Sequence, residues 1–289
     1  MKYIIKKIII YILSQKQVRS IFHRFIHNVL MKVEVEEKHL EKLFSEKEPK
    51  ILVVSLHKSG THLIKNILKL GGLTPGASLG GYTYSLIDFA GLKKNQYLLA
   101  HRAPAHFNIL KLIEEKKIKV IFNYRDPRDV CVSRLNNAKP SNLKNISKPN
   151  RRFMKKVFEN YYKSDSAFLD AIITGNDNLF RDGLSSVRQF FEESRGLFYS
   201  PDIFNVCFED IIGPKGGGTR KKQLQAIQGL FEYLGLEVDA NSIAENAYDP
   251  DSRTFHKGQI GNYKKVFTKK QLALFNKHNG HLLKDYKYK

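Results

Sequence analysis

The sequence is poor in cysteine and has no long apolar run. Its two cysteines, Cys131 and Cys207, are too few for a disulfide framework or a four-cysteine zinc site, and they favour a reducing compartment. No apolar stretch reaches the roughly 20 residues that a helix needs to cross a bilayer. These shortages argue against a disulfide-stapled secreted fold and a helical membrane-spanning protein, so we expect a cytoplasmic location.

Acidic residues are also few beside the bases. The chain of 289 residues has 28 Asp and Glu against 49 Lys and Arg, which gives a formal net charge of +21. Such an excess predicts a polyanionic partner, either nucleic acid, acidic lipid or a phosphorylated small molecule. The sequence shows no basic stripe interleaved with aromatic residues, no zinc-finger spacing and no RNA-recognition consensus, so we expect no nucleic acid partner.

The positive charge is dense in the first 33 residues, which contain seven bases and no acid. Apolar residues recur at positions 21, 22, 25, 26 and 29, which is the spacing of one helix face. A basic amphipathic helix of this kind can lie peripherally on an anionic membrane, pack on the following domain, or act as a targeting segment. We divide the chain into residues 1–48, a basic amphipathic segment with a linker, and residues 49–289, the functional domain.

The first candidate site follows a short apolar run at residues 51–56, which predicts a strand buried on both faces. A glycine-containing loop comes next, and apolar residues then recur at helical spacing. Gly60 would let the backbone approach an anion, while Lys58, Ser59 and Thr61 offer a charge and two hydroxyl groups. The Walker A motif places its lysine directly after a glycine, whereas Lys58 precedes Gly60, so an ordinary kinase or ATPase is disfavoured. An ordinary strand-to-helix turn is the alternative.

The second candidate site follows another apolar run at residues 118–124. Arg125 stands at the carboxyl end of this expected strand, where α/β sheets bind ligands. Pro127 suits the first turn of a helix, and Ser133 lies two turns further along it. Arg125 and Ser133 could therefore hold a second anion by charge-assisted hydrogen bonds. The alternative for Arg125 is a salt bridge to Asp129.

Two further segments complete a pattern with these two sites. Residues 255–264 read Phe-His-Lys-Gly-Gln-Ile-Gly-Asn-Tyr-Lys, and residues 206–210 read Val-Cys-Phe-Glu-Asp. With Lys58-Ser59-Gly60-Thr61 and the stretch from Arg125 to Ser133, they resemble the sulfotransferase family that uses 3′-phosphoadenosine 5′-phosphosulfate (PAPS). The matches follow the family's order over about residues 50–289.

The resemblance implies a donor site with two anion-binding ends. The first loop would hold the 5′-phosphosulfate, and the arginine and serine of the second motif would hold the 3′-phosphate. PAPS would be the donor and 3′,5′-adenosine bisphosphate (PAP) the product, with no metal required. The residues assigned to the donor are Lys58, Ser59, Gly60, Thr61, His62, Arg125, Ser133, Phe208, His256, Lys257 and Gly258.

A histidine between the two motifs is the expected general base. Sulfuryl transfer needs a group that takes the acceptor's proton and a cation where the leaving phosphate gains charge. His101 ends the apolar run 97–100, where the resembled family has its catalytic histidine, and Lys58 is the expected catalytic cation. A structural role for His101 and a rival base at His106 are the alternatives.

The sequence departs from the family pattern at several positions. Leu63 stands where the family has its adenine-stacking tryptophan, and Leu99 stands where the family has a lysine two residues before its catalytic histidine. Arg102 is a candidate replacement for that lysine. The positions that differ are His62, Leu63, Leu99, His256, Asn262 and Tyr263. These changes put the adenine contacts and one cation of the site in doubt.

We expect an α/β domain in which helices flank a central parallel sheet, a P-loop-like nucleotide-binding architecture. The expected function is transfer of a sulfuryl group from PAPS to a hydroxyl or amine. The acceptor is open among lipids, glycans and small alcohols or phenols. The alternatives are a catalytically silent anion-binding or membrane-surface protein on the same fold, and a kinase-like nucleotide enzyme.

Overall fold

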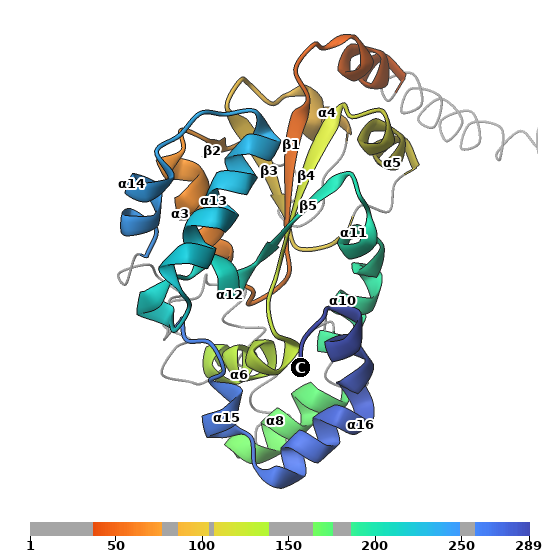
Figure 1. The fold of residues 1–289 in the computed structure, drawn as a ribbon. Helices are drawn as coiled ribbons and strands as arrows, with labels where there is room; N and C mark the ends of the chain where they lie inside the picture. Colours follow the sequence, from red (N-terminus) through yellow and green to blue (C-terminus); the bar gives the residue numbers. More distant parts are fainter. Residues whose placement is uncertain (1–36, 77–85, 104–106, 139–163, 176–185, 249–257) are drawn as a thin grey trace, which may run out of the picture.

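The computed structural model describes residues 37–76, 86–103, 107–138, 164–175, 186–248 and 258–289 (Figure 1). The predicted amphipathic segment, residues 1–33, lies outside these ranges, as do His106, His256 and Lys257. The predictions made for them therefore stay predictions. Within the described ranges, every helix is too short or too polar to span a bilayer.

Five parallel strands form the central sheet in the order β2-β3-β1-β4-β5. The strands are β1 (Lys50–Ser55), β2 (Thr74–Pro75), β3 (Gln96–Ala100), β4 (Ile118–Tyr124) and β5 (Ile203–Cys207). The apolar run at residues 118–124 matches the bounds of β4. The runs at residues 51–56 and 97–100 match the bounds of β1 and β3 to within one residue. This confirms the parallel sheet that the continuous apolar runs indicated.

Helices cover both faces of the sheet (Figure 1). They are α3 (Thr61–Leu70), α4 (Leu86–Ala90), α5 (Phe107–Glu114), α6 (Pro127–Ala138), α8 (Asp165–Thr174), α10 (Val187–Glu193), α11 (Arg195–Tyr199), α12 (Phe208–Ile211), α13 (Arg220–Leu234), α14 (Ala240–Asn246), α15 (Tyr263–Val266) and α16 (Lys269–Asp285), with a 3₁₀ turn at Pro214–Gly216.

Alternate residues of the central strands pack into two separate hydrophobic cores. Val53 and Ile121 pack with apolar residues of α3, α12, α13 and α14. Leu52, Val54 and Phe122 pack with residues of α5, α6, α8, α10, α11 and α16 on the other face. All five side chains are fully buried, which is why these strands carry no polar alternation in the sequence.

The parallel arrangement brings the sequence motifs to one edge of the sheet. Val54 pairs with Ala100, Ser55 with Asn123, and Tyr124 with Cys207. The segments that directly follow these strand ends are the first loop, His101, Arg125 and Phe208. The fold thus gathers four separate parts of the sequence at the carboxyl edge, the usual ligand-binding edge of an open α/β sheet.

Two stretches contain more helix or more buried helix than their composition predicts. Residues 134–152, rich in Asn, Ser and Pro, predict a flap with little regular structure, but α6 continues through residue 138, and residues 139–152 lie outside the described ranges. Residues 34–50 have the composition of a linker or an exposed helix, and residues 37–45 are helical. This helix is not fully exposed, because Leu43 packs into the core with only 2% of its surface accessible.

Candidate functional site

The loop between β1 and α3 turns sharply at two residues. Lys58 and Gly60 have left-handed backbone conformations, with φ of 67° and 90°. The side-chain amide of Asn123 fixes the turn by donating to the carbonyl oxygen of Ser59 at 3.0 Å and to Oγ of Ser55 at 2.9 Å. The Ser55 hydroxyl also shares a hydrogen bond of 2.8 Å with the hydroxyl of Thr61. A side chain of strand β4 therefore holds the loop in place.

A glycine is needed at position 60 because the backbone is left-handed there and because no room is left for a side chain. A Cβ at Gly60 would lie 2.4 Å from Cδ2 of the buried Phe208 ring. We expect Gly60→Ala to lower the free energy of unfolding by about 2–4 kcal/mol, from left-handed strain and overpacking together. Urea unfolding of the purified protein measures this.

Gly72 provides a matched control for that substitution. It has φ of 85°, and a Cβ added there would meet no atom within 4 Å. Gly72→Ala should therefore carry only the left-handed strain of about 1–2 kcal/mol. Equal destabilisation of the two variants would contradict the close packing of Phe208 under the loop.

Lys58 places an ammonium group beside the loop. Its side chain is half-buried, and Nζ donates to Oδ1 of Asn137 on α6 at 3.1 Å. Burial, together with the positive charges of Arg134 and Arg125, lowers the pKa of Lys58 to about 8. The free protein thus holds a cation here that an incoming anion would stabilise.

His101 follows β3 and is bound to the neighbouring strand β1. Its Nδ1 lies 2.7 Å from the carbonyl oxygen of Ser55. Because a carbonyl oxygen only accepts, Nδ1 must carry the proton, and Nε2 is left with a lone pair. Burial lowers the pKa of His101, with partial opposition from this hydrogen bond. The imidazole is therefore neutral near pH 7 and can accept a proton at Nε2.

His57, in the loop between β1 and α3, packs directly on His101. The two rings are stacked with centroids 4.3 Å apart. His57 also contacts Phe190 of α10, with 5.2 Å between ring centroids. Burial, with nearby positive charges, lowers the pKa of His57 to about 3, so it stays neutral and serves as a packing surface for the expected base.

Arg125 forms the opposite end of the site. It makes the ion pair with Asp129 that the sequence offered as an alternative, at 3.3 Å, and also donates to the carbonyl oxygen of Gln259 at 2.8 Å. Its guanidinium lies 4.2 Å from the centre of the Phe208 ring. Ion pairing and ligand binding are compatible, because Arg125 has five N–H donors and also lines the pocket described next.

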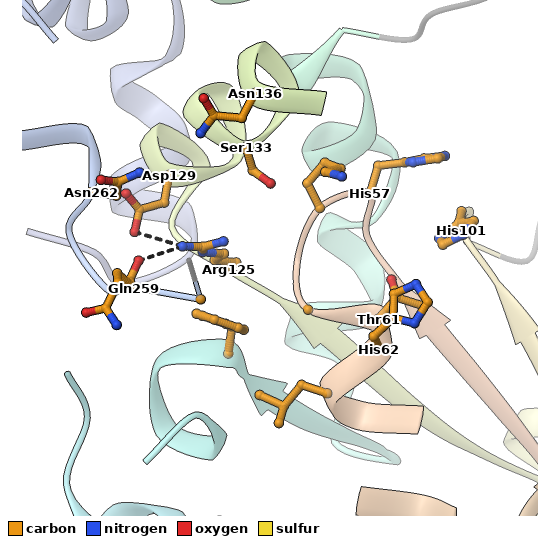
Figure 2. A pocket seen from close by; sticks show the side chains of 15 residues that line it. His57, Thr61, His62, His101, Arg125, Asp129, Ser133, Asn136, Gln259 and Asn262 are labelled. Carbon is orange, nitrogen blue, oxygen red and sulfur yellow. Dashed lines mark hydrogen bonds and ion pairs between the residues drawn. The ribbon is translucent and has the colours of Figure 1, made fainter. Parts of the chain in front are cut away.

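One cavity of about 220 Å³ joins these groups. Figure 2 shows Arg125, Asp129 and Gln259 on one side, and His57, His62 and His101 on the other. Of the residues predicted for the site, those lining the cavity are Lys58, Gly60, Thr61, His62, His101, Arg125, Ser133, Phe208 and Gly258. The remaining lining residues are His57, Leu63, Asp129, Asn136, Gln259 and Asn262.

Two residues considered from the sequence, Ser59 and Arg102, do not line the cavity. Ser59 is fully buried and does not line the cavity. Arg102, the candidate replacement for the missing cation, is exposed and points toward the Phe190 ring, 5.9 Å from its centre. Neither Arg102 nor Leu99 lines the cavity. Of the two lining cations, Lys58 and Arg125, Lys58 is the one whose charge helps to lower the pKa of His101.

Two buried polar atoms near the two ends of the cavity lack a hydrogen-bond partner among the described residues. They are the hydroxyl oxygen of Ser59 and Nε of Arg125. Buried polar groups are nearly always paired in folded proteins. Of these two residues, Arg125 lines the cavity and Ser59 does not.

The sheet, the glycine-containing loop and the shared cavity define a P-loop-like α/β protein with cationic and hydroxyl side chains gathered at the carboxyl edge of its sheet. Residues 48–211, more than half of the chain, match the model of the sulfotransferase domain family. The chain therefore belongs to this family, which confirms the resemblance and the enzyme class predicted from the motifs. No curated protein sequence matches the chain.

Solved structures share the fold at low sequence identity. One is mouse sulfotransferase SULT7A1 complexed with PAP, with a TM-score of 0.58 and 17% identity over 86% of this chain and 88% of that one. Another is retinol dehydratase in complex with androsterone and the inactive cofactor PAP, with a TM-score of 0.57 and 15% identity over 87% of each chain. Both support the predicted fold.

Proposed function

We propose that this sulfotransferase moves the sulfuryl group of PAPS to a hydroxyl or amine of its acceptor. The observation that carries the proposal is the single cavity bounded by Lys58, His101 and Arg125. A donor with phosphates at both ends fits two separated groups of cationic and hydroxyl side chains. The PAP that two structural neighbours contain is the product of such a donor.

The donor would lie across the cavity with its phosphosulfate at the β1–α3 loop. Lys58, the backbone at Gly60 and the hydroxyl of Thr61 are available to its anionic oxygens. Arg125 and Ser133 are available to the 3′-phosphate at the other end. His256 and Lys257, which the resemblance adds to this end, lie outside the described residues.

The adenine ring would meet apolar surface instead of a tryptophan. Leu63, the residue at the family's tryptophan position, lines the cavity and is 6% exposed. Phe208 lines it as well, beneath the Arg125 guanidinium. A leucine offers less contact area than an indole, so we expect the bisphosphate ends to supply most of the donor affinity.

In the transfer step, the acceptor oxygen or nitrogen forms a bond to sulfur as the bond from sulfur to the 5′-phosphate oxygen breaks. The electron pair of that bond goes to the phosphate, where the ammonium of Lys58 balances the new charge. Nε2 of His101 takes the acceptor proton. The products are the sulfated acceptor and PAP.

A screen with ³⁵S-labelled PAPS tests the proposed activity. The acceptors are phenols, small alcohols, amines, glycans and hydroxylated lipids in vesicles. The lipid arm addresses the membrane contact proposed for residues 1–33. Label should move to at least one acceptor class and release PAP stoichiometrically. Phosphoryl transfer from ATP to the same acceptors would favour the kinase-like alternative, and no transfer together with no nucleotide binding would favour a silent scaffold.

The lowered pKa of Lys58 predicts proton uptake when PAP binds above pH 8. Free Lys58 loses its proton as the pH rises through about 8, whereas a bound phosphate raises its pKa. The phosphates of PAP have a second pKa near 6, so they are fully ionised there. Calorimetry at pH 8.5 in buffers of different ionisation enthalpy should show uptake of about 0.75 proton, the fraction of free Lys58 that is deprotonated there. The same uptake in Lys58→Met would contradict this assignment.

A further inference from the structure

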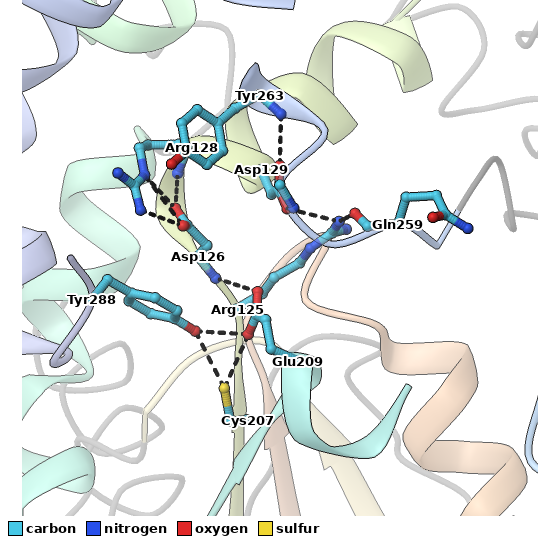
Figure 3. Close-up of polar contacts among 10 residues, drawn as sticks. Arg125, Asp126, Arg128, Asp129, Cys207, Glu209, Gln259, Tyr263 and Tyr288 are labelled. Carbon is cyan, nitrogen blue, oxygen red and sulfur yellow. Dashed lines mark hydrogen bonds and ion pairs between the residues drawn. The ribbon is translucent and has the colours of Figure 1, made fainter. Parts of the chain in front are cut away.

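Asp129 connects the two segments that form the Arg125 end of the cavity (Figure 3). Its Oδ2 accepts from the backbone N–H of Gly261 at 2.8 Å and from Arg125 at 3.3 Å. Its Oδ1 accepts from the backbone N–H of Tyr263 at 2.8 Å. The side chain is only 1% exposed, so these three donors are its solvation. One carboxylate thus binds both Arg125, just before the start of α6, and a loop far away in the sequence.

The same loop also binds Arg125 directly. The carbonyl oxygen of Gln259 accepts from Arg125 at 2.8 Å, which closes a ring of contacts with Asp129 and Gly261. Gly258, Gln259 and the arginine all line the cavity. The position of the guanidinium and the shape of the cavity wall therefore depend on one another through Asp129.

We propose that Asp129 is a positioning residue that sets the recognition of the donor's 3′-phosphate. This inference rests on the proposed function. Asp129 would act by holding the Arg125 guanidinium and the loop at residues 258–263 as one preformed unit. A preformed site binds its ligand without first ordering flexible groups. Less binding free energy is then lost to ordering, and the affinity is higher.

Other charged groups nearby do not share this role. Arg128 binds Asp126 through two nitrogens, at 3.0 Å from Nε to Oδ1 and 2.7 Å from Nη2 to Oδ2. The backbone N–H of Asp126 donates to Glu209 at 3.0 Å, and Glu209 accepts from the hydroxyl of Tyr288 at 2.9 Å. These groups fix the start of α6 from the opposite side (Figure 3). Arg128 also touches the loop, because its guanidinium lies 4.2 Å from the centre of the Tyr263 ring. Asp129 differs from it in accepting hydrogen bonds from both Arg125 and the loop backbone.

Asparagine at position 129 cannot reproduce this pattern. A carboxylate accepts at both oxygens, whereas an amide presents an NH₂ group to one of the two sides. That NH₂ group would face either the N–H of Tyr263 or the donors of Arg125 and Gly261. Asp129→Asn should therefore release the loop or the guanidinium while keeping nearly the same volume.

Calorimetry with PAP and with 5′-AMP tests the proposal on the full chain. Asp129→Asn should weaken PAP binding by about 30-fold, the equivalent of one charge-assisted hydrogen bond, and 5′-AMP binding by less than about threefold. 5′-AMP lacks the 3′-phosphate, so it should be almost insensitive to Arg125. Asp202→Asn, an exposed carboxylate on the surface, should change neither affinity.

Equal losses for both nucleotides, or unchanged or tighter PAP binding, would overturn the role of Asp129. Hydrogen exchange at the Gly261 and Tyr263 amides provides a readout that needs no nucleotide. Both amides should be protected in the wild type and should exchange at least tenfold faster in Asp129→Asn, as expected when about 1.4 kcal/mol of protection is lost. Unprotected amides in the wild type would also overturn it. A wild type that binds neither nucleotide while keeping protected amides would refute the proposed function but not the coupling of Asp129 to the loop.

Discussion

Replacing His101 with alanine should lower kcat by about 10²–10⁴-fold and leave PAP affinity within about threefold. The loss follows because Nε2 is the expected proton acceptor, whereas the proposed binding mode places the donor's phosphates elsewhere in the cavity. Steady-state transfer from labelled PAPS measures kcat, and calorimetry measures the affinity for PAP. Normal turnover in His101→Ala would show that another group takes the proton.

His101→Asn separates catalysis from structure. The asparagine amide can occupy the place of Nδ1 and donate to the carbonyl oxygen of Ser55, which His101 contacts at 2.7 Å. It lacks any group at the place of Nε2. We expect His101→Asn to unfold closer to the wild-type temperature than His101→Ala while being just as inactive. If the asparagine variant recovered activity, the histidine would be a structural strand-end residue.

Lys58→Met should lower kcat by about 10²–10³-fold, the usual loss when one charge-stabilising donor is removed from a transition state. Methionine keeps most of the length and volume of the lysine side chain but cannot donate to the leaving phosphate. We expect the donor's affinity to fall as well, because in the proposed binding mode the same ammonium would face the phosphosulfate. Single-turnover transfer at saturating PAPS isolates the chemical step from this binding loss.

Lys69→Met serves as the matched control for Lys58. Lys69 stands in the last turn of α3, the helix that begins at the loop, and its side chain is exposed. The same charge change there should leave kcat and donor affinity unaltered. Similar losses in both variants would mean that overall charge near α3, and not the contact at the leaving group, explains the effect of Lys58.

Much of the fold could be predicted because the central strands are buried on both faces. Runs such as residues 118–124 then stand out as continuously apolar, and a parallel sheet places everything that follows a strand at one edge. Local patterns and one rule of topology thus place Lys58, His101 and Arg125 at one edge of the sheet. Their roles toward the donor were implied by the resemblance to the sulfotransferase family.

Contacts that join distant segments could not be predicted in this way. Asn123 supports the first loop, but its own strand gives no sign that its amide reaches the carbonyl oxygen of Ser59. Gln259 contributes a backbone carbonyl, which carries no residue signature at all.

The packing of His57 on His101 depends on the spacing between β1 and β3 in three dimensions. From the sequence, Asp129 could be predicted only as a salt-bridge partner of Arg125. The backbone N–H groups of Gly261 and Tyr263 become its neighbours only on folding.

Calorimetric titration of the full chain with PAP, 5′-AMP and ATP tests the central claim most directly. The claim is that the cavity holds a nucleotide with phosphates at both its 3′ and 5′ ends. Such a site should bind PAP at least tenfold more tightly than 5′-AMP or ATP, because a charge-assisted contact to the 3′-phosphate is equivalent to about 1.5–3 kcal/mol. ATP binding as tight as PAP binding, or no binding of PAP, would contradict the account.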